Sequence, residues 1–383
     1  MARLGDICTV VSGSTPKSNI PEYWDGDIKW ITPAELTEQC YIITDSARHI
    51  TELGVQKTGL KPFPAGTVIL SSRAPIGKTA IAGCEMFCNQ GFKNLICSDQ
   101  VNNRYLYWFL TCNTDYLNSL GRGATFKEIS KGIVEDIEIP LPSISKQVEI
   151  AEKFEKVSDL IALRKEQLAK LDQLVNSRFI ELFGDPDTNP LGWNEDVLSE
   201  HLEVIGGYAF KSDKFEDEGI PVLRIGNINS GRFLPVNMVY WNDDPALERY
   251  KMYPGDLVMS LTGTVGKDDY GNVCILGADY PEYYLNQRNA KLSLKPTLNA
   301  KYLSELLKFE RIKRRLTGIS RGVRQANISN KDILCLCVPI APINLQQQFA
   351  AFVEQTDKSK LAIQQSLDKL ELLKNSLMQE YFG

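Results

Sequence analysis

Two long segments of the chain carry an apolar residue at alternating steps of four and three positions. The first runs from Ser145 to Phe183 without a proline or glycine, and a similar segment ends the sequence. Such spacing over about five heptads predicts a helix with a coiled-coil seam. A helix of 39 residues would be about 58 Å long at about 1.5 Å per residue. We predict a seam made of Ile150, Phe154, Val157, Ile161, Leu168, Leu171, Val175 and Leu182 in the first helix, and of Phe349, Val353, Ile363, Leu367, Leu370, Leu377 and Tyr381 in the second.

The segment before each helix has a different pattern. Short β-like runs alternate there with turns rich in glycine and proline and with one or two amphipathic helices. Prolines mark the entrance to each long helix, and Gly184 with the loop DPDTNP marks the exit of the first. We expect strands at Thr67–Ser71, Ile137–Ile139, Leu257–Leu261 and Ile333–Val338.

An internal repeat unites these patterns. Residues 171–184 (LDQLVNSRFIELFG) and 370–383 (LELLKNSLMQEYFG) are identical at seven of fourteen positions, at an offset of 199. Earlier pieces match in the same order, such as PAGTVILSSRAPIGK (64–78) with YPGDLVMSLTGTVGK (253–267), and LGDICTVVSG (4–13) with LSEHLEVIGG (198–207). Matches that keep their order along the whole chain indicate a tandem duplication.

The duplication predicts an α+β protein with four parts. We expect mixed α/β domains over residues 1–144 and 185–344, each followed by a long helix, over 145–184 and 345–383. Two similar helices in one chain most simply pack on each other as an antiparallel coiled coil. Parallel pairing, or docking of each helix onto a partner's helices, stays open at this point.

Charge is distributed unevenly along the chain. The net charge is −5, but residues 185–282 hold 18 acids and 7 Lys/Arg, whereas residues 301–331 hold 9 Lys/Arg and 2 acids. Local potential rather than net charge attracts phosphate, so the basic stretch is compatible with nucleic-acid binding. A solvated basic helix is the alternative interpretation.

Composition also indicates a compartment. The nine cysteines are an odd number without the spacing of a disulfide framework. The opening MARLGDICTVV has no charged segment followed by an apolar stretch, and the longest apolar run is far shorter than the ~20 residues that span a bilayer. We therefore expect a reduced, soluble, cytoplasmic protein without a signal peptide or membrane segment.

Catalytic motifs are incomplete wherever they begin. The two histidines, His49 and His201, occupy unmatched places in the two copies, and the cysteine pairs lack the partners of a zinc site. SRAPIGKT (72–79) resembles a phosphate-binding loop but has Ser72 in place of its first glycine. No Pro-Pro occurs, as an adenine methyltransferase motif would require, and no acidic nuclease motif is complete. We predict no catalytic site, no metal and no cofactor.

At this point the sequence resembles a known family along nearly its whole length. The pattern LGDI-x4-SGSTP (4–16), GTVILSSRAPIGK (66–78), NQGF (89–92) and the string G-x-x-F-x-x-I-S…IPLP…Q ending at Gln147 are similar to specificity subunits of type I restriction–modification enzymes. The second copy has a diverged version of each, with Gln346 in the place of Gln147. It departs most at residues 206–210, where GGYAF replaces SGSTP.

The resemblance implies two target-recognition domains, each reading one half of an asymmetric, split DNA sequence. It implies that the helices act as a spacer and as docking surfaces for two modification subunits. Those subunits would carry S-adenosylmethionine and methylate adenine, and ATP-driven restriction subunits would join the complex.

Donor-rich residues in corresponding segments are the candidate DNA contacts. Lys and most Arg would bind phosphate, Asn and Gln suit adenine, and some Arg could read guanine. Tryptophans such as Trp24, Trp30 and Trp241 are more often core residues than stacking platforms. The candidates are Ser14, Thr15, Lys17, Arg73, Lys78, Lys93, Arg122 and Thr125 in the first domain, and Lys211, Arg224, Asn227, Asn229, Arg232, Thr262, Lys267, Arg288, Arg321, Arg324 and Gln325 in the second.

A competing interpretation is a non-enzymatic coiled-coil scaffold with two modules that bind protein or sugar. A DNA titration at low and moderate salt separates the two classes. A DNA reader loses affinity steeply as salt rises, because binding releases counterions from the phosphates. A scaffold for protein or sugar would not bind DNA.

Overall fold

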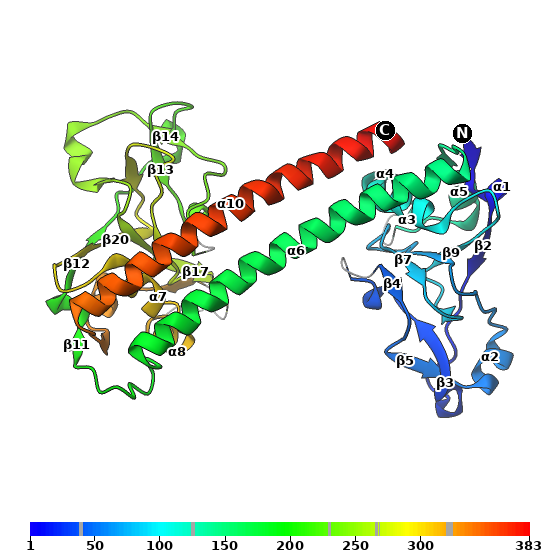
Figure 1. Ribbon diagram of the computed structural model, residues 1–383, viewed down its shortest axis with the longest axis horizontal. Helices are drawn as coiled ribbons and strands as arrows, with labels where there is room; N and C mark the ends of the chain where they lie inside the picture. The colour runs from blue at the N-terminus through cyan, green and yellow to red at the C-terminus, as the bar shows by residue number, and fades with distance from the viewer. Residues whose placement is uncertain (38–40, 124–126, 229–230, 265–266, 268, 319–324) are drawn as a thin grey trace. The chain divides into compact units, whose positions relative to one another are not determined.

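The computed structural model describes residues 1–383 except 38–40, 124–126, 229–230, 265–266, 268 and 319–324 (Figure 1). The chain forms two compact units. Unit 1 comprises residues 1–165 and 365–383, and unit 2 comprises residues 166–364. Each unit therefore contains one half of each long helix, so this division differs from the one that we predicted from the repeat.

Unit 1 is built on two small sheets. The larger has the order β2-β9-β6-β7-β4, and the smaller has the order β5-β3-β8. Apart from the parallel pair β4–β7, the larger sheet is antiparallel. Its strands are β2 (Cys8–Ser12), β9 (Lys93–Cys97), β6 (Val68–Leu70), β7 (Thr79–Ala82) and β4 (Ile42–Ile43). Those of the smaller sheet are β5 (Arg48–Ile50), β3 (Trp24–Ile31) and β8 (Phe87–Cys88), and β1 (Ala2–Arg3) pairs separately with β10 (Glu138–Ile139).

Helix α3 (Asn103–Cys112) supplies much of the core of unit 1. Asn102 caps its first turn by accepting hydrogen bonds from the backbone N–H groups of Arg104 and Tyr105. Six consecutive residues, from Tyr105 to Leu110, are buried. The other helices before the first long helix are α1 (Leu4–Ile7), α2 (Glu52–Thr58), α4 (Thr114–Ser119) and α5 (Lys131–Glu135).

Unit 2 is likewise built on a main sheet and a second sheet. The main sheet has the order β12-β20-β16-β18, and the second has the order β14-β13-β19-β15. The main strands are β12 (Leu202–Gly206), β20 (Asn289–Leu294), β16 (Leu257–Ser260) and β18 (Val273–Ile275). The second sheet consists of β14 (Tyr240–Trp241), β13 (Ile220–Leu223), β19 (Tyr283–Leu285) and β15 (Lys251–Met252). Two further pairs join β11 (Glu195–Val197) to β22 (Cys337–Pro339) and β17 (Thr262–Thr264) to β21 (Gln325–Asn327).

The structure confirms the duplication strand by strand. The antiparallel pairs β2–β9 and β12–β20 correspond, as do β6–β9 and β16–β20. Helix α7 (Ala300–Leu306) takes the place of α3, and Asn299 caps it as Asn102 caps α3. Helices α8 (Glu310–Thr317) and α9 (Asn330–Leu334) follow before the second long helix.

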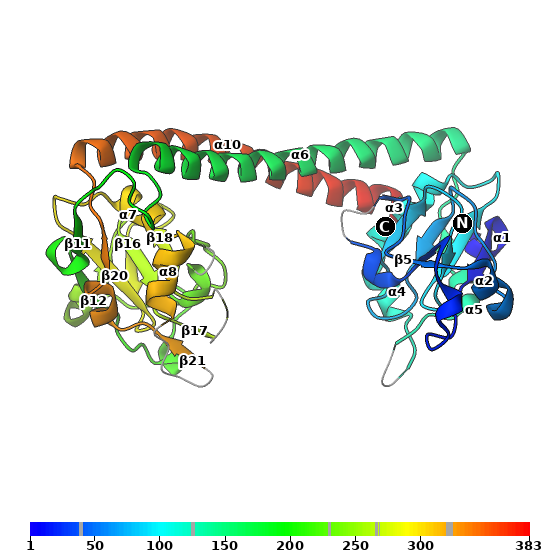
Figure 2. The ribbon, with the colours of Figure 1, turned by 90° about the horizontal axis from the view of Figure 1, so that it is seen from below.

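The two long helices are α6 (Ile144–Phe183) and α10 (Ile343–Phe382), each of 40 residues. In unit 1 the beginning of α6 packs against the end of α10, where the rings of Phe154 and Phe382 stack with centroids 5.5 Å apart. In unit 2 the end of α6 packs against the beginning of α10, with Phe179 and Phe349 edge to face at 5.4 Å. The antiparallel pairing is therefore confirmed. Figure 2 shows the end of α6 and the beginning of α10 beside α7 in unit 2.

Each residue of the predicted seam is buried or half-buried. Toward the helix ends the seam merges with the cores of the units, since Ile150 and Phe154 belong to the core of unit 1 and Phe349 and Val353 to that of unit 2. The sequence pattern missed three aromatic side chains that complete these cores: Phe179, Phe183 and Phe382.

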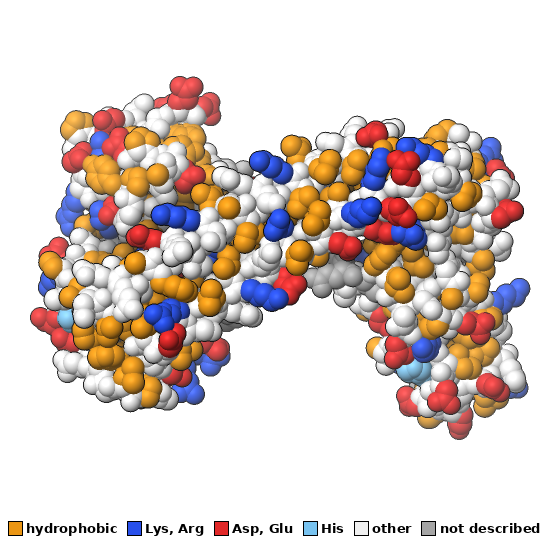
Figure 3. Space-filling view, viewed as in Figure 1, with side chains coloured by type: hydrophobic (Ala, Val, Ile, Leu, Met, Phe, Trp, Pro, Cys, Tyr) orange, Lys and Arg blue, Asp and Glu red, His pale blue; other side chains and the backbone are white. Residues whose placement is uncertain are grey.

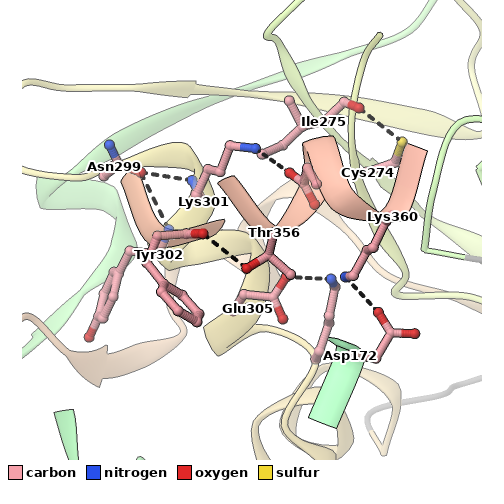
Figure 4. A network of polar contacts seen from close by, with 12 residues as sticks. Asp172, Cys274, Ile275, Asn299, Lys301, Tyr302, Glu305, Thr356 and Lys360 are labelled. Atoms are coloured by element: carbon pink, nitrogen blue, oxygen red, sulfur yellow. Dashed lines mark hydrogen bonds and ion pairs between the residues drawn. The ribbon is translucent and has the colours of Figure 1, made fainter. Parts of the chain in front are cut away.

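Ion pairs tie α10 to its neighbours in unit 2. The ammonium of Lys360 lies 2.6 Å from a carboxylate oxygen of Asp172 on α6, and that of Lys301 on α7 lies 2.6 Å from Asp357 on α10. Figure 4 shows Lys301 and Lys360 reaching across from their helices. Because the side chains of Asp357 and Asp172 are 47% and 71% exposed, each pair contributes at most about 1 kcal/mol and mainly fixes direction.

One predicted strand is wrong at four of its six residues. Within the predicted strand Ile333–Val338, Ile333 and Leu334 belong to α9, and the strand β22 begins only at Cys337. Ser329 starts the helix because its side chain and that of Asp332 form a capping box, whose local hydrogen bonds outweigh the apolar run. None of the helices in the described part of the chain is long and apolar enough to cross a membrane.

Candidate nucleic-acid interface

The same backbone hydrogen bonds join three loops in both units. In unit 1 the N–H of Ser72 donates to Gly91 O at 2.8 Å, and that of Ile129 donates to Ser72 O at 2.9 Å. In unit 2 the N–H of Leu261 donates to Arg288 O at 2.8 Å, and that of Ile328 donates to Leu261 O at 2.9 Å. We call these places the loop junctions, formed by residues 12–17, 71–73, 88–93, 122–123 and 127–129 in unit 1 and by 206–208, 261–264, 286–289 and 325–328 in unit 2.

A glycine allows the first segment, residues 12–17 in unit 1 and 206–208 in unit 2, to join each junction. Ser14 N–H donates to Cys88 O at 3.0 Å, and Tyr208 N–H donates to Leu285 O at 2.9 Å. A Cβ on the preceding residue, Gly13 or Gly207, would lie about 2 Å from a backbone carbonyl oxygen. Only glycine permits so close an approach, which explains why both copies keep it.

The junction of unit 1 brings together several of the predicted DNA contacts. Ser14 and Thr15 lie on the first segment, and the Thr15 hydroxyl donates to Gln90 Oε1 at 2.5 Å. Arg73 and Arg122 each form a β-bridge with Glu128. The side chains of Thr15, Arg73 and Arg122 are exposed, as a DNA contact requires. Lys17 is also exposed, while Lys78 is half-buried and its ammonium approaches Pro33 O at 3.5 Å.

Lys93 has a different environment from the one that we expected. The residue is only 7% exposed, and its ammonium lies 3.3 Å from Glu128 Oε1 and 3.4 Å from the Ser72 hydroxyl. The other oxygen of Glu128 accepts a hydrogen bond from Arg73 Nε at 2.9 Å. Lys93 is thus committed to an ion pair inside unit 1, which leaves it little surface for phosphate.

The electrostatics of Glu128 follow from these neighbours. Burial alone would raise the pKa of its carboxyl group, but the hydrogen bonds from Arg73 and Lys93 outweigh burial and lower the pKa below the ordinary value of 4.5. Glu128 is therefore ionised at neutral pH, and the three side chains carry one net positive charge. The sequence pattern did not single out Glu128. The repeat aligns Glu128 with Asn327 of the second copy, and this difference in charge was the signal that could have identified it.

In unit 2, Thr262 and Arg288 lie at the junction. Thr262 is 8% exposed and pairs with Asn327 across β17–β21, whereas Arg288 is exposed. Lys267 is exposed on the loop that follows β17, and Lys211 is exposed on the segment after Tyr208. Figure 2 shows β17 and β21 at the end of unit 2 that faces away from α6 and α10.

Three other predicted contacts of unit 2 lie elsewhere. Asn227 is 1% exposed, and its amide donates to the carbonyl oxygens of Leu234 and Val236. The Arg224 guanidinium donates to Asn237 O. Arg232 lines a hollow of about 1300 Å³ between the β18 side of the unit and the long helices. The burial of Asn227 is incompatible with a DNA contact, and its amide instead binds the backbone at Leu234 and Val236.

The remaining predicted contacts include four residues outside the described part of the chain and one of which only the backbone is described. Thr125, Asn229, Arg321 and Arg324 lie outside the described residues, and only the backbone of Gln325 is described, as the first residue of β21.

Helix α8 carries four of the basic residues of this stretch, Arg311, Lys313, Arg314 and Arg315. The side chains of Arg311 and Arg314 are 74% and 72% exposed, next to Asp187 and Glu310 respectively. Arg315 instead donates to Cys337 O at 3.0 Å. On the face shown in Figure 3, basic and acidic side chains are interspersed in each part of the molecule.

Potential metal ligands do not gather in the described part of the chain. No group of three or more His, Cys, Asp or Glu there could hold a metal ion. His49 and His201 each lie 3.3 Å from a carboxylate oxygen, of Asp45 and Asp196 respectively. Burial raises the pKa of the Cys88 thiol to about 12, so this thiol is not a ready nucleophile.

The two glutamines at which the repeated motifs end, Gln147 and Gln346, have a structural role that the sequence did not reveal. Gln147 and Gln346 are fully buried, and the Oε1 of each accepts a hydrogen bond at 2.8 Å from the backbone N–H of the capping residue, Asn102 or Asn299. The side-chain amide of each donates to two backbone carbonyls. Each glutamine therefore fastens the first turn of a long helix to the start of the helix beneath it.

Comparison with known proteins gives a consistent result. The family model of the type I restriction modification DNA specificity domain matches residues 1–173 and 190–373. A specificity subunit of Methanocaldococcus jannaschii, of the type I restriction enzyme MjaIX, is 36% identical over 270 residues, which cover 65% of this chain and 62% of that protein. The chain thus spans less than two thirds of this relative. The MjaVIII specificity subunit of the same organism is 23% identical, over 99% of this chain and 90% of that protein.

Two solved structures share the fold. The crystal structure of a type I restriction–modification S subunit from M. genitalium matches with a TM-score of 0.63 at 15% identity, over 100% of this chain and 95% of the other. A chain from a structure describing complex assembly and conformational transition of a type I restriction–modification system matches with a TM-score of 0.58 at 19% identity, over 100% of this chain and 96% of the other.

Proposed function

The chain belongs to the family of type I restriction–modification DNA specificity domains, and on this basis we propose that it is a DNA specificity subunit. It binds double-stranded DNA and determines which sequence its partner subunits modify or cleave. The duplicated loop junction supports this proposal most strongly, because one backbone frame is built twice and carries different exposed side chains each time.

We propose that residues 1–144 and 185–344 each read one half of an asymmetric, two-part DNA sequence. Different donors at equivalent places suit different half-sites, because base edges are distinguished by their patterns of donors and acceptors. The candidates for these contacts are Ser14, Thr15, Lys17, Arg73 and Arg122 in the first domain and Lys211, Lys267 and Arg288 in the second, together with the predicted residues that lie outside the described part.

The long helices have the properties of a spacer and a docking surface. Several of their apolar side chains are exposed, among them Leu163 (47%), Leu361 (61%) and Leu372 (67%). Exposed apolar side chains on a helix are typical of a surface that a partner covers. We propose that two modification subunits bind there, that ATP-driven restriction subunits join through them, and that catalysis resides in these partners. The proposal places the chain in the cytoplasm, with the DNA.

The decisive experiment maps methylation in cells that carry this chain with its modification subunit. We expect one two-part sequence to be methylated. Replacing residues 1–144 by those of another family member should change one half of that sequence and leave the other unchanged. A change in both halves would contradict independent reading, and DNA binding that ignores salt would favour the protein- or sugar-binding scaffold.

The spacer role has its own test. Four helix-forming residues inserted after Lys170 add about 6 Å of rise and nearly one turn, so the seam is shifted rather than destroyed. The gap between the half-sites should lengthen by one or two base pairs, at about 3.4 Å each. Two inserted residues would rotate the seam by about 200° and abolish assembly. An unchanged gap after the four-residue insertion would show that the helices do not set the spacing.

A further inference from the structure

The loop junction of unit 1 holds a charged cluster at places where unit 2 has uncharged residues. Glu128 lies between two cations, with Lys93 Nζ 3.3 Å from one carboxylate oxygen and Arg73 Nε 2.9 Å from the other. The side chain of Lys93 is 9% exposed, that of Glu128 34% and that of Arg73 45%. The cluster therefore runs from a buried cation, through a half-buried acid, to an exposed guanidinium.

The equivalent places in unit 2 are uncharged. Strand register aligns Leu95 with Leu292, since they pair with Val68 and Leu257, and this alignment sets Lys93 against Ala290. The bridge between Arg73 and Glu128 corresponds to the pair of Thr262 and Asn327. The backbone hydrogen bonds are thus the same, and at these three equivalent places only unit 1 carries charged side chains.

The backbone around Glu128 also fixes its position. Arg122 and Glu128 exchange two backbone hydrogen bonds of 3.0 Å, and the next residue, Ile129, donates to Ser72 O. A carboxylate held in this way determines the plane of the guanidinium that donates to it. Because Glu128 accepts from Nε, the two terminal amino groups of Arg73 are not used in that contact and lie on the exposed side chain.

A fixed guanidinium next to a carboxylate suits a base edge better than a phosphate. The negative charge of Glu128 weakens the attraction of Arg73 for phosphate, but it leaves the terminal N–H donors in a defined plane. Two parallel donors from one arginine match O6 and N7 of guanine in the major groove. A phosphate contact needs charge more than direction, and the exposed lysines of the chain supply it.

We propose that Arg73 reads a guanine in the half-site of unit 1 and that Glu128 is the positioning residue that aims it, with Lys93 as the buried counter-charge of Glu128. This inference rests on the proposed function, because it names one base contact of the proposed DNA reader. Unit 2 reads its half-site without a residue of this kind at the equivalent place.

The test uses the complete complex with its modification subunit and maps methylated sequences for four variants. Arg73→Ala removes the proposed guanine contact. The double variant Lys93→Met with Glu128→Ala removes the carboxylate that orients Arg73 without leaving a buried charge unpaired. Lys93→Met alone keeps the Glu128–Arg73 bond and controls for the altered interior. Asn327→Ala is the matched change in unit 2. Thermal unfolding of each purified variant verifies that it is folded.

We expect Arg73→Ala and the double variant to relax the requirement for the same single guanine in one half-site, with discrimination reduced about 10- to 100-fold. Lys93→Met should retain that requirement, and Asn327→Ala should leave this half-site unchanged. The salt dependence of binding should be the same for Arg73→Ala and the unmodified chain, because a base contact releases no counterion.

Three outcomes would overturn the inference. Arg73→Ala with an unchanged sequence and a log–log salt slope lower by about one would make Arg73 a phosphate contact. A double variant that keeps the full guanine requirement would remove Glu128 from the positioning role. An unmodified complex that methylates no defined sequence would overturn the proposed function as well, whereas a defined sequence that none of these variants alters would overturn only this inference.

Discussion

The two loop junctions have the same backbone and different side chains. In both, a glycine lets the first segment approach, and equivalent N–H groups bond to equivalent carbonyls. Yet unit 1 places Arg73, Lys93 and Glu128 where unit 2 has Thr262, Ala290 and Asn327. Backbone bonds do not depend on side-chain identity, so the frame can persist through duplication while its surface diverges. A duplicated reader can thereby acquire a second sequence preference without a new fold.

Among the features that the two units share, we expect the buried aromatic residues at the ends of the long helices to contribute most to the free energy of unfolding. Phe382 packs between Tyr105, Phe109 and Phe154 in unit 1, and Phe179 packs against Tyr302 and Phe349 in unit 2. We expect Phe382→Ala and Phe179→Ala each to lower the free energy of unfolding by about 3–5 kcal/mol. Hydrogen exchange should locate the loss in unit 1 for the first variant and in unit 2 for the second. Leu372→Ala, at a 67% exposed position of α10, should stay within about 0.5 kcal/mol.

The paired glutamines test whether the two frames are equally important. Removing the Gln147 or Gln346 side chain leaves three buried or part-buried backbone groups without their partner. We expect each change to alanine to cost about 2–4 kcal/mol, with the two values within about 1 kcal/mol of each other. Urea unfolding of both variants measures this, with Gln348→Ala, an exposed glutamine on α10, as the control. A large effect in one unit only would break the equivalence of the two frames.

The charged cluster should make unit 1 alone sensitive to acid at its junction. Because the pKa of Glu128 is lowered in the folded protein, its stabilisation is fully present above its ordinary pKa of 4.5 and is lost as pH falls through the lowered value. We expect Glu128→Gln to cost about 1–2 kcal/mol at neutral pH, since the carboxylate is partly exposed, and less as the pH falls below 4.5. Glu135→Gln, which removes a surface pair with Lys131, is the control. A penalty that does not change with pH would contradict this account.

The exposed arginines of α8 should have the smallest effect on stability. Arg311→Glu and Arg314→Glu change side chains that are almost fully exposed, so unfolding should shift by no more than about 0.5 kcal/mol. If these residues bind phosphate, the variants weaken binding to all DNA sequences, and each lost contact lowers the log–log salt slope by about one. Lys57→Glu, exposed on α2, is the control in DNA titrations. An unchanged slope in folded variants would assign α8 to a protein partner or to solvent.

The sequence by itself determined the architecture of this protein. The repeat at offset 199 and the three–four spacing of apolar residues sufficed for the duplication and the two long helices, and a single chain with two such helices favoured their antiparallel pairing. These features are periodic, and a periodic pattern requires no knowledge of distant contacts. The pattern failed at Ile333 and Leu334, because the Ser329 capping box decided a local competition between helix and strand. It also missed Phe179 and Phe382, which meet residues remote in the sequence.

Only the tertiary structure decided what the polar residues do. By residue type, Lys93, Asn227 and Arg73 were equivalent candidates for DNA contact. The fold buries Lys93 against Glu128, uses the amide of Asn227 to hold a loop, and leaves the terminal amino groups of Arg73 at the surface. Whether a donor meets DNA or its own chain depends on which carboxylates and carbonyls lie within about 3 Å of it. Those neighbours come from distant parts of the chain, and no local pattern in the sequence specifies them.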